Sequence, residues 1–182
     1  IKDKMKGSYL GPCFSDKHIE NELKLLKANY VKLTEENLIE TVSNYLNKEK
    51  TVGWFQGRME FGPRALGCRS IIADPRSEKM QKELNMKVKF RESFRPFAPS
   101  VLFEDVSNWF DLNIESPYML LVAKIKKELR IEMSELHKNL FGIDKLNIKR
   151  SKIPAVTHID YTARIQTVHN ETNPKYYKLL KK

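Results

Sequence analysis

The chain has 182 residues, which suits one domain or one domain with an appendage, and its 41% hydrophobic and 10% aromatic residues are enough to form a core. The surface is predicted to be very polar and basic, because 31% of the residues are charged, the mean hydropathy is −0.54 and the net charge is +10. A basic surface of this kind could also bind nucleic acid, so that class of partner is not excluded. No apolar stretch approaches the roughly 20 residues of a membrane span, and the first residues lack the apolar core of a signal peptide, so we expect no membrane contact.

Capping residues and helical spacing in the first half predict three helices. They are expected at about 17–28 after Ser15, 35–48 after Thr34 and 78–85 after Ser77. β-Branched and aromatic content predicts strands at 51–56 and 70–73, and a short strand or bridge at 30–33. We interpret Trp54 and Phe55 in the first of these strands as core residues.

In the second half, a strand at 98–103 begins at a proline, where no ladder donor is needed, and a short helix at 104–110 follows. The run YMLLVAK predicts a strand at 118–124, whereas 126–152 is an excursion of mixed charge. Strands at 155–159 and 164–168 flank a tight DYTA turn, and Asn173 followed by proline opens a last helix. This alternation predicts an α/β fold, or α+β, on a mixed twisted sheet flanked by helices.

The two cysteines, Cys13 and Cys68, lie far apart, which argues against a disulfide scaffold and predicts a reducing, cytoplasmic environment. Neither has a Cys or His at metal-ligand spacing, so we expect no structural metal site in this chain. The chain begins with Ile1 and stops within an amphipathic pattern, and we expect both ends to be cuts through a longer protein.

Arginine is concentrated in one region of the chain. Six of the nine arginines lie between Arg58 and Arg95, whereas the 24 lysines are scattered. Residues 57–100 hold ten basic and five acidic residues, so this quarter of the chain carries +5 of the net charge of +10. Arginine is favoured where a planar fork must bind a phosphate or carboxylate at two points, so the cluster indicates an anion-binding site.

Gly57, Gly62 and Gly67 recur every five residues between two predicted strands. Glycine permits positive φ angles and lets a ligand approach the main chain, so the spacing predicts a rigid loop that presents guanidinium groups and amides to one anion. The loop is neither a Walker A loop nor a Rossmann fingerprint. The alternative is a tight connection whose arginines pair with Glu60 and Asp74.

A second basic run follows the glycine loop. Lys87, Lys89, Arg91 and Arg95 lie within nine residues, against the single acid Glu92. In an extended segment these four side chains would share a face and repel one another unless an anion lay among them, and a triphosphate or carbamoyl phosphate would suit. The alternative is that they fan out into solvent.

A further polar group lies at the predicted turn near the carboxyl end. His158 and Asp160 flank Ile159, and Arg164 follows on the next strand. We interpret Arg164 as a ligand contact. A histidine beside an aspartate is more often a structural pair than a catalyst, and no Ser-His-Asp or Cys-His arrangement follows from the spacing, so no catalytic residue is assigned.

The segments GRMEFGPRALGCRSIIADPR, KFRESFRPFAPSVL and AVTHIDYTARIQTV resemble the carboxy-terminal domain of the NodU/CmcH-type O-carbamoyltransferases. The match covers about 7–182, and the first motif is long and specific. These enzymes look like fusions of an actin-like, ASKHA-type domain with a YrdC-like α/β domain. The resemblance implies that 1–16 is a leading segment from an upstream ASKHA-type domain and that 17–182 is a partial YrdC-like domain, truncated at its carboxyl end.

The resemblance also implies a two-step transferase reaction in the cytoplasm. Carbamoyl phosphate loses its phosphate, and the carbamate attacks the α-phosphorus of ATP to form carbamoyl adenylate and pyrophosphate. The carbamoyl group then passes to a substrate hydroxyl in the amino-terminal domain. The implied small-molecule partners are carbamoyl phosphate and ATP, which would bind as a substrate together with Mg²⁺. The implied protein partner is the amino-terminal domain of the same polypeptide, and iron or another metal is expected only in that domain. Whether the protein forms a homodimer is left open.

Carried over by motif, four residues are expected to contact carbamoyl phosphate or ATP. They are Arg64 in GPRALG, Lys89 in KVKFR, Arg95 in SFRPF and Arg164 in TARIQ. Arg58, Arg69 and Arg91 are second choices that would orient the first set or close the pocket. We expect the tips of the first four to converge on one hollow.

Two departures from the family pattern matter. Cys68 stands where the family usually has Asn in GNRS, which predicts the loss of a loop hydrogen bond. The chain also stops before the family's NTSFN-type segment, so the isolated chain is expected to lack the full reaction. The alternative function is a nucleotide- or RNA-binding YrdC-like module without transferase activity, although predicted burial of the aromatic strand argues against nucleic acid.

Overall fold

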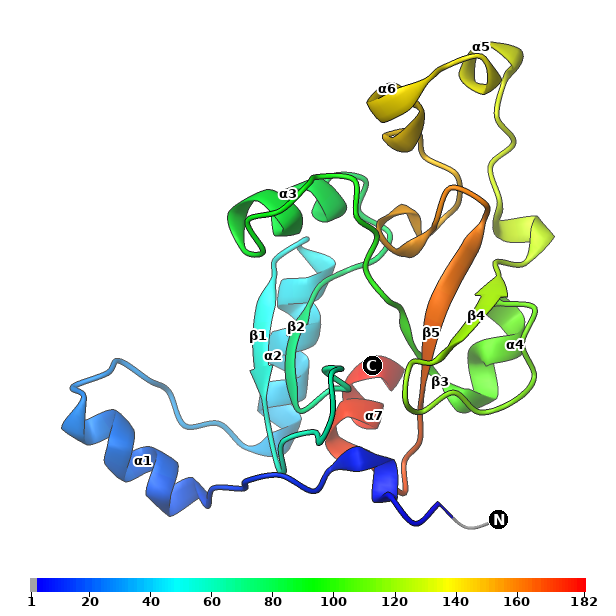
Figure 1. Cartoon of the computed structure of the whole chain (residues 1–182). Coiled ribbons are helices and arrows are strands. Elements are labelled where there is room, and N and C mark those ends of the chain that lie inside the picture. The colour runs from blue at the N-terminus through cyan, green and yellow to red at the C-terminus, as the bar shows by residue number, and fades with distance from the viewer. Residues whose placement is uncertain (1–2) are drawn as a thin grey trace.

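The computed structural model describes residues 3–182 and confirms the α/β class (Figure 1). The α-helices are α1 (Asp16–Leu25), α2 (Glu35–Asn47), α3 (Met80–Lys87), α4 (Val106–Trp109), α5 (Glu135–Lys138), α6 (Gly142–Leu146) and α7 (Pro174–Lys181). The strands are β1 (Val52–Phe55), β2 (Arg69–Ile72), β3 (Ser100–Leu102), β4 (Leu121–Lys124) and β5 (Thr162–Val168). The short 3-10 helices are η1 (Lys6–Ser8), η2 (Phe103–Asp105), η3 (Lys127–Leu129) and η4 (Pro154–Val156).

The strands are divided between two small sheets, where the sequence pattern predicted one. β1 and β2 form an antiparallel pair whose register sets Phe55 opposite Arg69. In the second sheet β5 is central, parallel to β3 and antiparallel to β4, with Ser100 opposite Gln166 and Val122 opposite Arg164. The pattern of a strand identifies its two faces but not its neighbours, which is why the division could not be predicted.

Three helices begin where their capping residues predict. The side chains of Ser15, Thr34 and Asn173 each accept a hydrogen bond from the backbone N–H three residues later, which satisfies a donor that the first helical turn leaves free. The third predicted helix starts later, at Met80, and Ser77 does not cap it. The excursion at 126–152 contains α5 and α6, neither of which buries a residue, and both project from the sheets in Figure 1.

Two predicted strands are wrong. The segment 155–159 is not a strand, because Pro154 opens the 3-10 turn η4 and the hydroxyl of Thr157 donates to the carbonyl of Ile153 at 2.7 Å. The segment 30–33 has no regular secondary structure and no bridge to a neighbouring strand, and its side chains are exposed. β-Branched and aromatic content alone therefore overstated the amount of strand.

Two main hydrophobic clusters hold the elements together. The first lies between α2, α7 and the β1–β2 sheet and is built from Ile39, Val42, Trp54, Ile72, Val168, Tyr176 and Leu179. The second packs α4 against β5 and includes Phe110, Ile125 and Ile165. The interpretation of Phe55 as core is wrong, because β1 points Trp54 inward and leaves Phe55 58% exposed.

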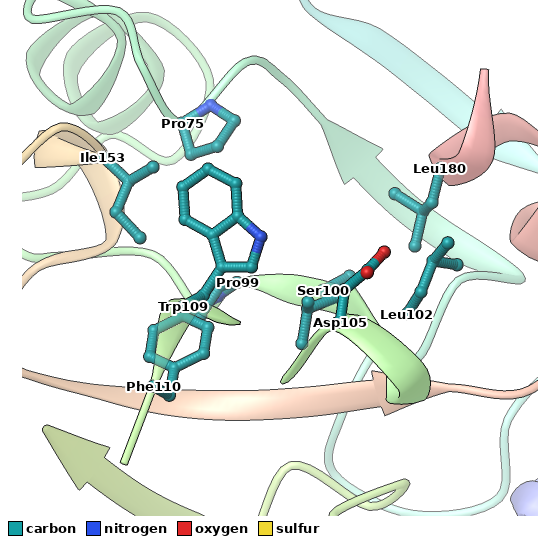
Figure 2. Close-up of a pocket in the computed structure, with 10 residues that line it drawn as sticks. Pro75, Pro99, Ser100, Leu102, Asp105, Trp109, Phe110, Ile153 and Leu180 are labelled. Atoms are coloured by element: carbon teal, nitrogen blue, oxygen red, sulfur yellow. The ribbon is translucent and has the colours of Figure 1, made fainter. Parts of the chain in front are cut away.

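A cavity of about 280 Å³ lies beside β3, where α4, α7 and η4 approach one another (Figure 2). Its walls are mostly apolar and include Pro75, Trp109, Ile153 and Leu180, with the carboxylate of Asp105 at one side. By contrast α1 lies apart from the rest of the fold in Figure 1 and buries no residue.

Among residues 3–182, no helix is long and apolar enough to cross a membrane.

Candidate anion-binding site

The glycine loop between β1 and β2 is organised by a buried carboxylate. One oxygen of Glu60 accepts hydrogen bonds from the backbone N–H groups of Leu66, Cys68 and Arg69 at 2.8, 2.7 and 3.1 Å. Glu60 is 6% exposed, so these amides take the place of water around its charge. The loop therefore curls around Glu60, and the alternative in which its arginines pair with Glu60 does not hold.

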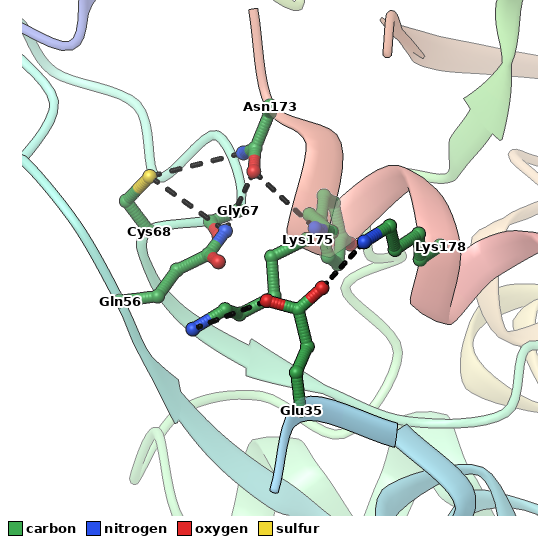
Figure 3. Close-up of polar contacts among 8 residues, drawn as sticks. Glu35, Gln56, Gly67, Cys68, Asn173, Lys175 and Lys178 are labelled. Atoms are coloured by element: carbon green, nitrogen blue, oxygen red, sulfur yellow. Dashed lines mark hydrogen bonds and ion pairs between the residues drawn. The ribbon is translucent and has the colours of Figure 1, made fainter. Parts of the chain in front are cut away.

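Polar side chains from outside the loop fix its second half (Figure 3). The amide of Gln56 donates to the carbonyl of Gly67 at 2.9 Å and to the side chain of Asn173 at 2.6 Å. The amide of Asn173 in turn lies 3.7 Å from the sulfur of Cys68. The same asparagine caps α7, so the loop and the start of that helix form one hydrogen-bonded unit. The backbone N–H of Cys68 is held by Glu60, and the predicted loss of a side-chain hydrogen bond at this position stays a prediction.

The loop is also tied to the central strand of the other sheet. The amide of Gln166 donates to the carbonyl of Leu66 at 2.8 Å, and its oxygen accepts from the hydroxyl of Ser100 at 2.9 Å. The hydroxyl of Tyr9 reaches the same Leu66 carbonyl at 2.9 Å. Gln166 is 2% exposed, so this connection lies in the interior.

This connection brings two of the predicted arginines together. Arg64 precedes Leu66 by two residues, and Arg164 precedes Gln166 by two residues on the same face of β5. The bond between Gln166 and the carbonyl of Leu66 therefore holds the segment of Arg64 beside the face of β5 that carries Arg164. Burial lowers the pKa of Arg164, and the positive charge of Arg64 lowers it further. The Nε atoms of both side chains are buried and have no hydrogen-bond partner among residues 3–182.

Arg58 and Arg69 are engaged with backbone carbonyls. Arg58 donates to Gly11 at 3.1 Å. The guanidinium of Arg69 donates to the carbonyls of Gln56, Gly57, Pro12 and Cys68 and lies 3.5 Å above the ring of Phe55. These two arginines attach the residues before α1 to the glycine loop, which fits the second-choice role of orienting the others.

The second basic run is not extended, so the predicted common face is wrong. Lys87 ends α3 and pairs with Glu83, and 89–95 turns back on the helix. Arg91 donates to the side chain of Asn85 at 2.6 Å. Arg95 pairs with Glu92 at 2.8 Å on the surface, and Lys89 is exposed. Asn85, fully buried, holds the run in this turn by donating to the carbonyls of Ser93 and Arg95.

The turn before β5 adds a histidine to the arginine pair. The Nδ1 atom of His158 lies 2.9 Å from the hydroxyl of Thr162, and that hydroxyl donates to Asp160 at 2.7 Å. Burial lowers the pKa of His158, an effect that the charge of Asp160 opposes and the charge of Arg164 reinforces. Thr162 and Arg164 lie on the same face of β5, so His158, which is bonded to Thr162, lies near Arg164. The lowered pKa of His158 leaves the ring neutral at neutral pH.

The two described cavities lie elsewhere. Neither the cavity beside β3 nor a shallower one of about 430 Å³ between α2 and α7 is lined by any of the seven predicted residues. The convergence of Lys89 and Arg95 with the arginine pair on one hollow stays a prediction. Within 3–182, no group of three His, Cys, Asp or Glu side chains could hold a metal ion.

Sequence reasoning missed the residues that shape the site. Glu60 was considered only as a partner for arginines, and Gln56, Gln166 and Asn173 were not considered as parts of the loop. One signal was present, since a carboxylate within a glycine-rich loop is well placed to accept the loop's own amides. The contacts of Gln166 and Asn173 span 100 and 117 residues and have no local signal.

Comparison with known proteins agrees with the motif-based resemblance. Residues 43–182 match the family model described as carbamoyltransferase C-terminus. The chain is 57% identical over 98% of its length to the protein sll1178 of Synechocystis, and 35% identical over 98% to the nodulation protein NolO of Bradyrhizobium diazoefficiens. It is 37% identical over 76% of its length to a 3′-hydroxymethylcephem-O-carbamoyltransferase of Streptomyces clavuligerus.

The chain spans only 29%, 30% and 22% of these three relatives, respectively. The family match nevertheless includes both arginines of the half-buried pair, the glycine loop and the β5 strand. The loop, the arginine pair and these comparisons together identify the chain as a member of the carbamoyltransferase C-terminal family.

Proposed function

We propose that this chain is the part of an O-carbamoyltransferase that binds carbamoyl phosphate and ATP and forms carbamoyl adenylate. In the proposed reaction, water attacks carbamoyl phosphate and releases carbamate and inorganic phosphate, and a carbamate oxygen then attacks the α-phosphorus of ATP and displaces pyrophosphate. A substrate hydroxyl bound by another part of the polypeptide then takes the carbamoyl group from the adenylate and releases AMP. The family match and the relatives named as carbamoyltransferases support this proposal.

The arginine pair is the single observation that carries the proposal. Two like charges held side by side and partly removed from water repel each other, and here their inner nitrogens have no described partner. An anion between them would remove the repulsion, and it would give both Nε–H donors a partner once the side chains turned toward it. A phosphate group suits such a pair, because the guanidinium fork matches its oxygens at two points.

The other basic residues have different tasks in the proposal. Arg58 and Arg69 hold the loop in shape through carbonyls and do not contact the substrates directly. Lys89 and Arg95 are exposed, and the surface pair between Arg95 and Glu92 is of a kind that contributes little stability. Both side chains are therefore free to turn toward a bound triphosphate.

The remaining partners also belong to the proposal. Mg²⁺ would arrive with the phosphates of ATP, and no step of the mechanism is assigned to protein metal ligands. The hydroxyl acceptor would bind an amino-terminal ASKHA-type domain, with 1–16 leading out of that domain and 17–182 forming a YrdC-like unit.

The test is pyrophosphate exchange in the natural full-length polypeptide. Carbamoyl phosphate should stimulate exchange of label between pyrophosphate and ATP, and Arg64→Ala or Arg164→Ala should lower this rate at least about hundredfold, because a bidentate charged contact is lost. Arg64→Lys should recover little, since an ammonium group cannot replace the fork. Lys82→Ala removes the same charge from an exposed position on α3 and should change nothing.

Salt dependence separates this function from RNA binding. A nucleotide held by two arginines should respond weakly to added salt, whereas RNA binding should weaken steeply as counterions are released. Unchanged exchange in both arginine variants, with folds intact by circular dichroism, would remove the pair from the site and overturn the proposal.

A further inference from the structure

The turn that leads into β5 is held rigidly beside the arginine pair. The backbone N–H of His158 donates to the carbonyl of Thr162 at 2.8 Å, and the N–H of Tyr161 donates back to the carbonyl of His158 at 3.1 Å. The N–H of Thr162 also donates to the carboxylate of Asp160 at 3.1 Å. These bonds fix the position of the His158 side chain relative to Arg164, two residues beyond the turn.

A chain of hydrogen bonds sets the tautomer of His158. The single proton of the Thr162 hydroxyl is donated to Asp160 at 2.7 Å, so this oxygen can only accept from the histidine. The Nδ1 atom, 2.9 Å away, must then carry the ring proton. In the neutral ring the other nitrogen, Nε2, is left as a hydrogen-bond acceptor, and none of the hydrogen bonds within residues 3–182 ends on it.

The surroundings of Nε2 are chemically asymmetric. Thr162, Arg164 and Gln166 share one face of β5, so the histidine bonded to Thr162 and the segment of Arg64 bonded to Gln166 lie on either side of Arg164. The arginines supply donors and positive charge, whereas the neutral imidazole supplies an acceptor. A plain phosphate ester would satisfy the arginines but offer nothing to this acceptor. A ligand that joins a phosphate to an N–H donor a few atoms away would satisfy both, and carbamoyl phosphate has this composition.

We propose that His158 Nε2 accepts a hydrogen bond from the amino group of carbamoyl phosphate and thereby selects carbamoyl phosphate over acyl phosphates. This inference rests on the proposed function and adds a specificity-determining residue to it. Asp160 and Thr162 are positioning residues, because they act only by holding the ring and its tautomer.

Acetyl phosphate is the matched probe, because it replaces the amino group with a methyl group and keeps the phosphate and carbonyl. We expect the full-length polypeptide to bind carbamoyl phosphate about tenfold more tightly than acetyl phosphate, measured by isothermal titration calorimetry with both ligands freshly dissolved. A single neutral hydrogen bond, with its acceptor left unpaired in the competing complex, accounts for a ratio of this size.

Two substitutions separate the two nitrogens of the ring. His158→Asn places an amide N–H where Nδ1 stands, so it keeps the bond to Thr162 and removes Nε2. We expect it to bind both phosphates equally. His158→Gln extends an amide oxygen to the position of Nε2 and should recover part of the preference. A merely structural histidine would give the opposite order, with the Asn variant closest to the wild type.

The outcomes distinguish this inference from the function on which it rests. If the wild type binds both phosphates with one affinity, or His158→Asn keeps the tenfold ratio, the role of His158 is overturned while phosphate binding by the arginines stands. If neither phosphate binds the wild type, the proposed function itself fails, and the inference fails with it. Loss of the ratio in the Asn variant and its partial return in the Gln variant supports the inference.

Discussion

The buried carboxylate of Glu60 should be the largest single contribution of the glycine loop to stability. Its one oxygen accepts from three backbone amides, at 2.7, 2.8 and 3.1 Å, and the side chain is 6% exposed. Glu60→Ala removes the acceptor and leaves three amides without partners in a region that admits little water. Each buried donor left without an acceptor lowers the free energy of unfolding by about 1–3 kcal/mol. The loss is smaller for a donor that can bind a water molecule entering the new cavity.

We therefore expect Glu60→Ala to lower the free energy of unfolding by about 3–5 kcal/mol, a large part of the 5–15 kcal/mol that is typical of a domain. Glu60→Gln keeps an acceptor of the same shape but loses its charge, so its cost should be about 1–2 kcal/mol. Urea denaturation followed by circular dichroism measures both values. The matched control is Glu128→Ala, which removes a carboxylate from an exposed position with no described ion pair.

The order of the three variants is the decisive result. If Glu60→Ala unfolds within 0.5 kcal/mol of the control, roughly the size of an ordinary surface change, the amides of the loop do not depend on Glu60. Glu60 would then not organise the loop, and the position of Arg64 near Arg164 would have another cause.

Two further predictions concern the same loop. Gly67 has a φ of +98°, and an added Cβ would lie 2.7 Å from Cε1 of buried Tyr176. Gly67→Ala should therefore lower the free energy of unfolding by about 2–5 kcal/mol, measured by thermal or urea denaturation. Gly53→Ala, whose new Cβ would have no atom within 4 Å, is the control, and equal stability of the two variants would contradict the close approach of Gly67 to Tyr176. Burial, with the charge of Glu60 adding to it, raises the pKa of the Cys68 thiol to about 12, whereas Cys13 is exposed. A thiol reagent at pH 8 should therefore titrate one cysteine in the native protein and two in urea, and two fast-reacting thiols in the native state would show that Cys68 is accessible.

Local signals in the sequence predicted much of the fold correctly. The caps at Ser15, Thr34 and Asn173 fixed the starts of three helices, because capping depends on only a few neighbouring residues. The strands β1, β2 and β5 were predicted within one or two residues, and the α/β class follows from the alternation of elements. Where composition was the only signal, as at 155–159, a single proline overrode the strand preference.

The candidate site was harder to predict, because its geometry depends on distant contacts. Clustering of arginine located the loop, but it could not tell an arginine that faces a ligand from one that binds carbonyls. Arg69 and Arg64 look equivalent in sequence, yet Arg69 is held by carbonyls that include that of Pro12, 57 residues away. The basic run after Lys87 was expected to be extended, whereas buried Asn85 folds it back on α3. The contact of Arg69 has no local signal, whereas the contacts of Asn85 span only eight and ten residues and could have been considered.

The contacts of the glycine loop also constrain the order of events during synthesis. The loop bonds to Gln166 across 100 residues and to Asn173 through Gln56 across 117 residues, and Gly67 packs on Tyr176. A nascent chain that has just released residues 57–69 from the ribosome has none of these partners. The loop can therefore reach its final shape only after about a hundred further residues have emerged, and such late, long-range closure is typical of slowly folding proteins.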